Sequence, residues 1–367
     1  MRRLVLGALF SLLVLSALAA QEPAAGQPLE QPFTVSGSLR AELTGNIPAD
    51  SSITPYAGNL LRLYSIVDLA PVRSARSHLD VEADFSGLSS SADSSLLEST
   101  KAQLNEAWLR ADVSDTIVLL AGKRRIAWGT GFFNNPTDFV NPPKDPSDPE
   151  AQRMGVWSVQ AGIYLPAVSI EQAAIIYDKL DSTGYAAKLS TSALIPSTDV
   201  NLVVFYAKPE GFKTGGSFDT SPFGDLPVLS GVNLHGELAV TSTWTVKALG
   251  GLRFLAPGTD TYFVAEYMYL DDSSYRHNLA FTFVQPNLTS KVSAFTDSLS
   301  AQATLLLNPV DTSALLRASI GSGYIENCTI SLEGTWFLGP IASEFGSLRV
   351  GPTGLWGTIQ LIVEVGY

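Results

Sequence analysis

Apolar and polar residues alternate with a period of two along most of the chain after residue 32. The stretches 33–43, 77–85, 244–254 and 328–338 show it most clearly. Between Ser77 and Phe85, the apolar positions are Leu79, Val81, Ala83 and Phe85, and the polar positions are His78, Asp80, Glu82 and Asp84. This period predicts β-strands that have one face in apolar surroundings and the other towards water.

The length of these stretches favours a membrane barrel over a soluble sandwich. Many span roughly ten residues, which suits a tilted strand that crosses a bilayer, whereas soluble strands average about 5 to 6. Aromatic residues such as Trp244 and Phe254 lie at the ends of apolar faces, where interfacial girdles occur. We therefore expect an all-β fold, a transmembrane antiparallel up-and-down β-barrel.

The connections between the stretches fall into two length classes. Tight links are predicted at 112–115, 165–167, 195–197, 241–243, 271–274 and 308–311, and longer ones at 44–59, 86–100, 122–153, 209–227 and 285–292. Outer-membrane barrels have short periplasmic turns and long outer loops, so we expect each class at its own end. The count gives about 18 strands, with 14 or 16 as alternatives, and periplasmic termini.

The final stretch, Trp356 to Tyr367, has an ending typical of outer-membrane proteins. Ile359, Leu361, Val363, Val365 and Tyr367 form one face, and Ile362 is the one apolar residue on the other. An aromatic terminus with apolar residues at every second position resembles the signal that the bacterial barrel-assembly machinery reads. We assign Val363, Val365 and Tyr367 to that signal and expect this machinery and outer-membrane lipid as partners.

Residues 1–20 read as a secretory signal peptide. Arg2 and Arg3 precede an apolar run, and cleavage is expected near Ala19 or Ala20. A flexible leader, 21–32, and the barrel, 33–367, follow. The chain is 46% hydrophobic and 16% charged, against about 25% charged in typical soluble domains. Its net charge of -12 argues against nucleic acid as a partner, and the single Cys328 permits no internal disulfide.

The longest connection is the best candidate for a functional element. Its prolines from Pro136 to Pro149 exclude a regular ladder, and long loops in compact domains are usually functional or disordered. We define the loop as 126–153 and the wider region as 122–153. Its candidate constriction residues are Lys123, Arg124, Arg125, Trp128, Asp138, Asp145 and Asp148. Alternatively, the cations hold the loop down at the strand end, and Trp128 and the phenylalanines pack it onto the wall.

A family resemblance covers about fifty residues around this loop. It comprises Gln103 to Leu109, then Leu120 to Gly129 with its Gly-Lys-Arg-Arg-Ile-Ala-Trp-Gly run, then Asn135-Pro136-Thr137-Asp138. These motifs resemble porin-like bacterial barrels, including alginate-export-type and related outer-membrane families. The resemblance implies a pore, and the third outer loop of porins often folds into the barrel. The proline-rich part from Pro142 to Pro149 departs from the family pattern.

The polar faces supply candidate lumen-lining residues of both signs. They are Arg40, Glu42, Asp80, Glu82, Asp84, Glu106, Arg110, Lys247, Arg253, Glu266, Glu333 and Glu364. Such a wall predicts a wet, weakly acidic pore with a mild cation preference. The alternative is a wall of internal salt bridges around a closed lumen.

The sequence therefore favours a channel for passive diffusion of small hydrophilic solutes, with the 122–153 region narrowing or capping the pore. The alternative is a closed barrel that acts as an adhesin or receptor through its outer loops. An enzyme ranks third, because no Gly-X-Ser-X-Gly, His-Glu-X-X-His or phosphate-loop motif occurs. No cofactor or metal is expected, since His78, His235 and His277 lack ligand spacing. A homo-oligomer is compatible with this class.

Overall fold

The computed structural model describes residues 33–48, 54–68, 75–87, 99–142, 154–177, 183–208, 210–224, 226, 229–271, 277–286, 299–325, 327–340, 342–347 and 355–366. They form 18 strands: β1 (Phe33–Pro48), β2 (Thr54–Asp68), β3 (Ala75–Gly87), β4 (Ser99–Ser114), β5 (Ile117–Arg124), β6 (Val156–Tyr164), β7 (Val168–Ile176), β8 (Gly184–Ile195), β9 (Thr198–Ala207), β10 (Gly211–Thr220), β11 (Val232–Thr241), β12 (Val246–Leu255), β13 (Tyr262–Leu270), β14 (His277–Gln285), β15 (Leu299–Asn308), β16 (Ser313–Ile325), β17 (Cys328–Leu338) and β18 (Leu355–Gly366). No helix among the described residues has both the length and the apolar character to cross a bilayer.

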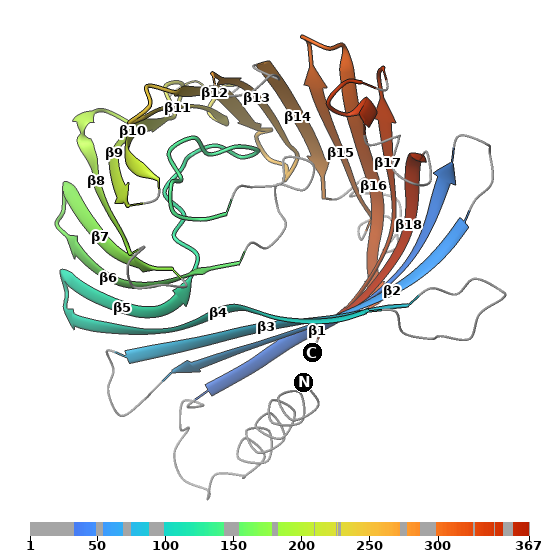
Figure 1. Ribbon diagram of the computed structural model, residues 1–367, viewed down its shortest axis with the longest axis horizontal. Coiled ribbons are helices and arrows are strands. Elements are labelled where there is room, and N and C mark those ends of the chain that lie inside the picture. The colour runs from blue at the N-terminus through green and yellow to red at the C-terminus, as the bar shows by residue number, and fades with distance from the viewer. Residues whose placement is uncertain are drawn as a thin grey trace, which may run out of the picture.

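The sheet closes on itself. Each strand pairs antiparallel with the next along the chain, and β1 pairs with both β2 and β18. Leu39 of β1, for example, lies opposite Leu61 on one side and Val365 on the other. Figure 1 shows the strands as a ring around a central space. The predicted antiparallel up-and-down barrel is confirmed, and the strand number agrees with the count of about 18.

Alternation divides the described strands into an outer and an inner face. In β9, Leu202, Val204 and Tyr206 are exposed, whereas Val203 and Phe205 are buried on the inside. In β18, Ile359, Leu361 and Val365 are exposed and Ile362 is buried, so the exception in the sequence pattern is an inward residue. Tyr367 lies outside the described residues.

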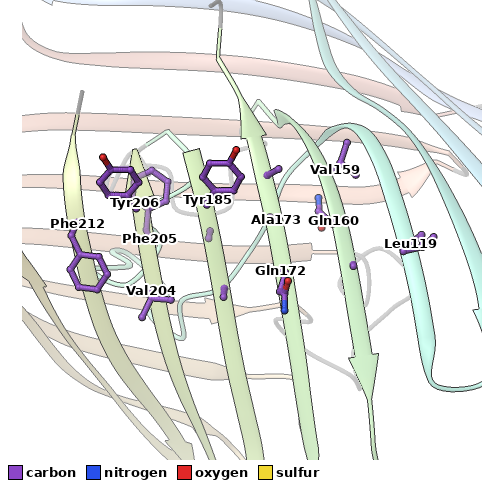
Figure 2. A pocket seen from close by; sticks show the side chains of 14 residues that line it. Leu119, Val159, Gln160, Gln172, Ala173, Tyr185, Val204, Phe205, Tyr206 and Phe212 are labelled. Carbon is purple, nitrogen blue, oxygen red and sulfur yellow. The ribbon is translucent and has the colours of Figure 1, made fainter. Parts of the chain in front are cut away.

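The outer face carries a shallow apolar depression over β5 to β10. Figure 2 shows Leu119, Val159, Tyr185, Tyr206 and Phe212 around it. Small side chains, including Ala161, Ala174 and Ala187, are also among its lining residues, and its volume is about 490 Å³. An outer wall of exposed aliphatic and aromatic residues is what contact with hydrocarbon requires.

The expected segregation of long and short connections holds only in the first half of the chain. The links 115–116, 165–167 and 196–197 lie at the end where β1 begins. The predicted tight links 241–243, 271–274 and 308–311 lie at the other end, with the 125–155 connection, which we call the loop end. This prediction was wrong because the predicted loop 209–227 contains β10. The chain therefore crosses the barrel once more than expected, and each later connection lies at the opposite end from the predicted one.

Two other predicted long connections also differ. Strands β1 and β2 extend through most of 44–59 and leave only residues 49–53 between them. The connection around 285–292 runs between β14 and β15 at the end opposite the loop end. Loop length is therefore a weak guide to sidedness in this barrel.

Candidate functional site: a segment held inside the barrel

The described half of the long loop lies inside the ring. We call residues 125–142 the inserted segment. Figure 1 shows its trace turning inward from β5 and running along the inner side of the wall. Ile126, Trp128 and Val140 pack in one buried cluster against the inward residues of β7, β8 and β9, which are Ala173, Ile175, Ala186, Val203, Phe205 and Ala207. Residues 143–153 lie outside the described part of the chain.

A second buried cluster holds the far turn of the inserted segment. Phe133, with none of its surface exposed, packs with Val264, Ala280, Leu306 and Leu315 of β13 to β16. Phe345, from the connection between β17 and β18, belongs to the same cluster. The inner wall is therefore apolar where the segment packs against it, which explains why β9 shows weaker alternation in sequence than an open lumenal strand would.

Glu237 of β11 binds the backbone of the inserted segment with both carboxylate oxygens. Its Oε1 accepts hydrogen bonds from the N–H groups of Thr130 at 2.5 Å and Gly131 at 2.7 Å, and from the Thr130 hydroxyl at 3.2 Å. Its Oε2 accepts the N–H of Thr137 at 2.9 Å and the Thr137 hydroxyl at 2.7 Å. One carboxylate thus ties together the two sides of the segment's turn. Charge-assisted bonds of this kind are about twice as strong as neutral ones.

Glu266 of β13 binds the tip of the same turn. Its Oε1 accepts the N–H of Phe132, and its Oε2 accepts the N–H groups of Phe133 at 2.9 Å and Asn134 at 3.4 Å. His235 of β11 approaches the same carboxylate, with Nε2 at 2.8 Å from Oε1. The side chains of His235 and Glu266 are almost entirely buried. The two carboxylates satisfy backbone N–H groups that would otherwise be buried without partners.

Gly251 allows His235 to reach Glu266. His235, Gly251 and Glu266 lie in register on β11, β12 and β13, so the histidine must extend past the middle strand. A Cβ at Gly251 would lie 2.5 Å from His235 Nε2 and 2.8 Å from Glu266 Cγ. Any larger residue at this position would occupy the space of the imidazole.

Further bonds fix the segment along its length. Trp128 donates its indole N–H to Glu171 of β7 at 2.9 Å, and Arg253 of β12 donates to the carbonyl of Thr130. The root is closed by Asn141, whose side chain accepts the N–H of Ile126 at 3.0 Å and donates to its carbonyl at 2.5 Å. Asp138 accepts both the backbone and side-chain N–H groups of Asn141.

The three consecutive cations at the root have different environments. Lys123 lies on the outward face of β5, and its ammonium donates to the carbonyl of Leu104 at 2.6 Å. Arg124 lies on the inward face, 5.5 Å from the ring of Trp108. The backbone N–H of Arg125 donates to Glu106 at 2.7 Å. Alternation along the strand therefore sends neighbouring cations to opposite sides of the wall.

The remaining predicted site residues are spread around the barrel. Arg110 pairs with Asp112 at 2.8 Å, Glu333 binds Arg317 through both oxygens at 2.7 and 2.8 Å, and Glu364 lies on the inward face of β18. Lys247 lies at the loop end of the lumen. For the others the side chains, or the whole residues, lie outside the described part: Arg40, Glu42, Asp80, Glu82, Asp84, Asp145 and Asp148.

A second segment between β17 and β18, described at residues 339–340 and 342–347, also packs onto the wall. Asn308 donates its side-chain amide to Glu344 at 2.8 Å, and Asp311 accepts the backbone N–H of Glu344 at 2.6 Å. Burial, together with the nearby Asp311 carboxylate, raises the pKa of Glu344, although the Asn308 bond opposes this shift. Sequence patterns did not single out this segment, because its contacts are made by short polar residues without periodicity.

Two cavities flank the inserted segment. One, of about 680 Å³, opens towards the end opposite the loop end, and Thr130, Glu171, Lys188, Asp199 and Arg253 are among its lining residues. The other, of about 610 Å³, lies towards the loop end and is lined by residues that include Phe139, Tyr177, Lys213 and Lys247. Asn135 contributes to both. The segment therefore forms a partition between two spaces inside the barrel, a mainly polar one and a more apolar one at the loop end.

Comparison with solved structures places this architecture among known barrels. Acinetobacter baumannii OccAB3 aligns with a TM-score of 0.58 at 10% identity, covering 91% of this chain and 99% of that one. The fold is that of a porin-like barrel. Pseudomonas aeruginosa OccK9 (OpdG) gives 0.57 at 10% identity over 91% and 98%, and a mutant Rh. blastica porin gives 0.50 at 8% over 91% and 100%. No protein-family model matches the chain, and neither does any curated protein.

Sequence reasoning named some of the wall residues that hold the porin-like barrel's inserted segment as lumen-lining candidates, namely Glu106, Arg253 and Glu266. Glu237 and Glu171 were not named as site residues, and His235 was noted only for lacking metal-ligand spacing. A usable signal did exist, because His235 and Glu237 lie two residues apart and so face the same side of a strand. What Glu237 binds could not be read from that spacing, because its partners are backbone N–H groups about a hundred residues away.

Proposed function

We propose that this protein is a bacterial outer-membrane channel through which small hydrophilic solutes diffuse passively, with the inserted segment narrowing the pore. The observation that carries the proposal is the partition itself: residues 125–142 lie inside an 18-stranded barrel, along its inner wall, and are bound to that wall by Glu171, Glu237 and Glu266. Barrels of about 16–18 strands normally leave an aqueous channel.

Several finer proposals accompany this one. The chain is exported to the outer membrane after cleavage near Ala19 or Ala20, is inserted by the barrel-assembly machinery through Val363, Val365 and Tyr367, and can assemble as a homo-oligomer. Its loop motifs support kinship with the alginate-export-type barrels. Arg124 and Asp138 are our candidates for the constriction, whereas Trp128 packs the segment onto the wall and Lys123 anchors the strand end at the outward face.

The test is single-channel conductance of the refolded mature protein in a planar bilayer, compared with a variant that lacks Asn134 to Glu150. Stable conductance steps that become larger on deletion are expected, because the deletion removes part of the partition. A folded, heat-resistant barrel without steps in either form would contradict the channel. That result would favour the alternative, a closed barrel that binds ligands through its outer loops.

A further inference from the structure

The attachment of the inserted segment depends on two buried carboxylates that act only as hydrogen-bond acceptors. Glu237 and Glu266 are 4% and 3% exposed. Three of these four carboxylate oxygens each accept bonds from two or more donors, and the fourth, Glu266 Oε1, accepts the Phe132 N–H beside His235 Nε2. Most of the donors are backbone N–H groups of residues 130–137. Backbone N–H groups cannot become acceptors. Protonation of either carboxylate therefore removes the negative charge from its bonds to them and weakens those bonds.

The inserted segment offers little to compensate for such a proton. Residues 129–137, Gly-Thr-Gly-Phe-Phe-Asn-Asn-Pro-Thr, contain no titratable side chain. On the wall, Asp219 lies in register with His235, accepts a hydrogen bond from Asn233, and is 3.9 Å from Arg253. The titratable and charged groups that face the two carboxylates from the neighbouring strands are Asp219 on β10, His235 on β11, and Lys247 and Arg253 on β12.

We propose that the segment is a proton-released partition: protonation of Glu237 and Glu266 detaches residues 129–137 from the wall, and loss of those protons docks them again. The direction follows from the donors, because the docked state binds the ionised carboxylates and the detached state exposes them to water. Docking is therefore complete at neutral pH and is lost as the pH falls. Since two carboxylates hold one turn, the transition takes up more than one proton.

The consequence for conduction rests on the proposed channel function, but detachment itself does not. Two readouts separate them. The first is conductance between neutral pH and roughly pH 3, the range in which carboxyl groups titrate. We expect it to rise by about twofold or more on acidification, as the partition leaves the wall.

The second readout follows the segment directly. A nitroxide spin label is placed at Asn134→Cys in a Cys328→Ala background, since the Asn134 side chain faces the loop-end cavity. Its electron paramagnetic resonance spectrum in detergent or lipid reports mobility whether or not the barrel conducts. We expect an immobilised spectrum at neutral pH and a mobile one in acid.

The double variant Glu237→Gln/Glu266→Gln mimics the protonated state, because each side-chain amide is uncharged and keeps only one acceptor oxygen. It is expected to show a mobile label and the larger conductance at neutral pH, with no further acid response. Asp199→Asn is the matched control, since Asp199 lines the same lumen and makes no hydrogen bond or ion pair with the inserted segment among the described contacts. This control should keep the acid transition of the parent protein.

Outcomes distinguish the two proposals. If acid makes the label mobile in a barrel that never conducts, the result would support the proton-released partition and contradict the proposed channel function. The proton-released partition would be overturned if the barrel conducts but the label stays immobile in two cases: in the parent protein in acid, and in a folded double variant at neutral pH. If the double variant does not fold, an unchanged label spectrum of the parent across the acid range is sufficient to overturn it.

Discussion

Gly251 lacks a side chain, and the space this leaves allows residues on neighbouring strands to form one anchor for the inserted segment. His235 and Glu266 are two strands apart, and their 2.8 Å contact passes over a position where any Cβ would collide with both. The anchor therefore depends on a residue that contributes no atom to it. A sequence scan for charged or nucleophilic groups does not find such a position.

The variant Gly251→Ala is expected to displace the His235 imidazole and to weaken the hold on the Phe132–Asn134 turn. The adjacent Gly250→Ala is the matched control, because a Cβ there meets nothing within 4 Å. Mobility of the Asn134 spin label at neutral pH measures the effect. Equal spectra for the two alanine variants would contradict the role given to Gly251.

Tyr177, just beyond β7, provides a pH test at the loop end. Burial, reinforced by the Glu210 carboxylate at 3.3 Å, raises the pKa of its phenol from 10.0 to about 12. The unfolded chain therefore loses this proton before the folded protein does, and the folded state loses stability as pH rises from 10 to 12. Ultraviolet absorbance is followed against pH in the parent and in Tyr177→Phe, and the difference between the two titrations should have its midpoint near pH 12. A midpoint at the ordinary value would contradict this environment.

The inserted segment combines two kinds of attachment, and each accounts for a different property. Its apolar residues, Trp128 and Phe133 above all, match apolar inner surfaces on β7 to β9 and β13 to β16. Its backbone N–H groups match Glu237 and Glu266. The apolar clusters supply attachment that does not depend on pH, whereas the carboxylates add attachment that does.

Phe133→Ala should therefore loosen the docked segment at neutral pH without acid. Truncating a buried phenylalanine typically costs about 3–5 kcal/mol. Here that cost falls on docking, because the phenylalanine belongs to the segment and not to the wall. Protease cleavage within the segment is expected to accelerate, while Phe212→Ala on the exposed outer face leaves it unchanged. Slow cleavage in both variants would show that the carboxylates alone hold the segment.

Strand β10 shows where pattern reading failed at the level of an element. Its sequence, Gly-Phe-Lys-Thr-Gly-Gly-Ser-Phe-Asp-Thr, is rich in glycine and polar residues, which indicated a loop. In the barrel Gly215 lies beneath Thr137, where a Cβ would be 2.9 Å from its methyl group. The strand lacks bulk on its inner face because the inserted segment occupies that space.

The barrel as a whole carries a net charge of -12, and its described lumen retains carboxylates such as Asp199 and Glu364 beside paired cations. We expect a mild preference for cations. Reversal potentials across a potassium chloride gradient measure it, and the preference should weaken with increasing salt because screening shortens the range of these charges. An anion-selective pore would contradict the acidic character assigned to the lumen.

Local sequence patterns were sufficient to assign the class of fold. A period of two, strands long enough for a bilayer and the pattern of Trp356 to Tyr367 are local properties, and each strand's two faces follow from its own residues. The sequence also located the long loop and its aromatic residues, because prolines and a break in alternation mark them in one dimension.

In contrast, what holds that loop and at which end each connection lies depend on contacts between distant parts of the chain. The anchors Glu237 and Glu266 are about a hundred residues from their partners, and strand register alone brings His235, Gly251 and Glu266 into one row. Such contacts depend on closure of the whole sheet, since a single strand determines which way a side chain points but not what lies opposite it across the lumen.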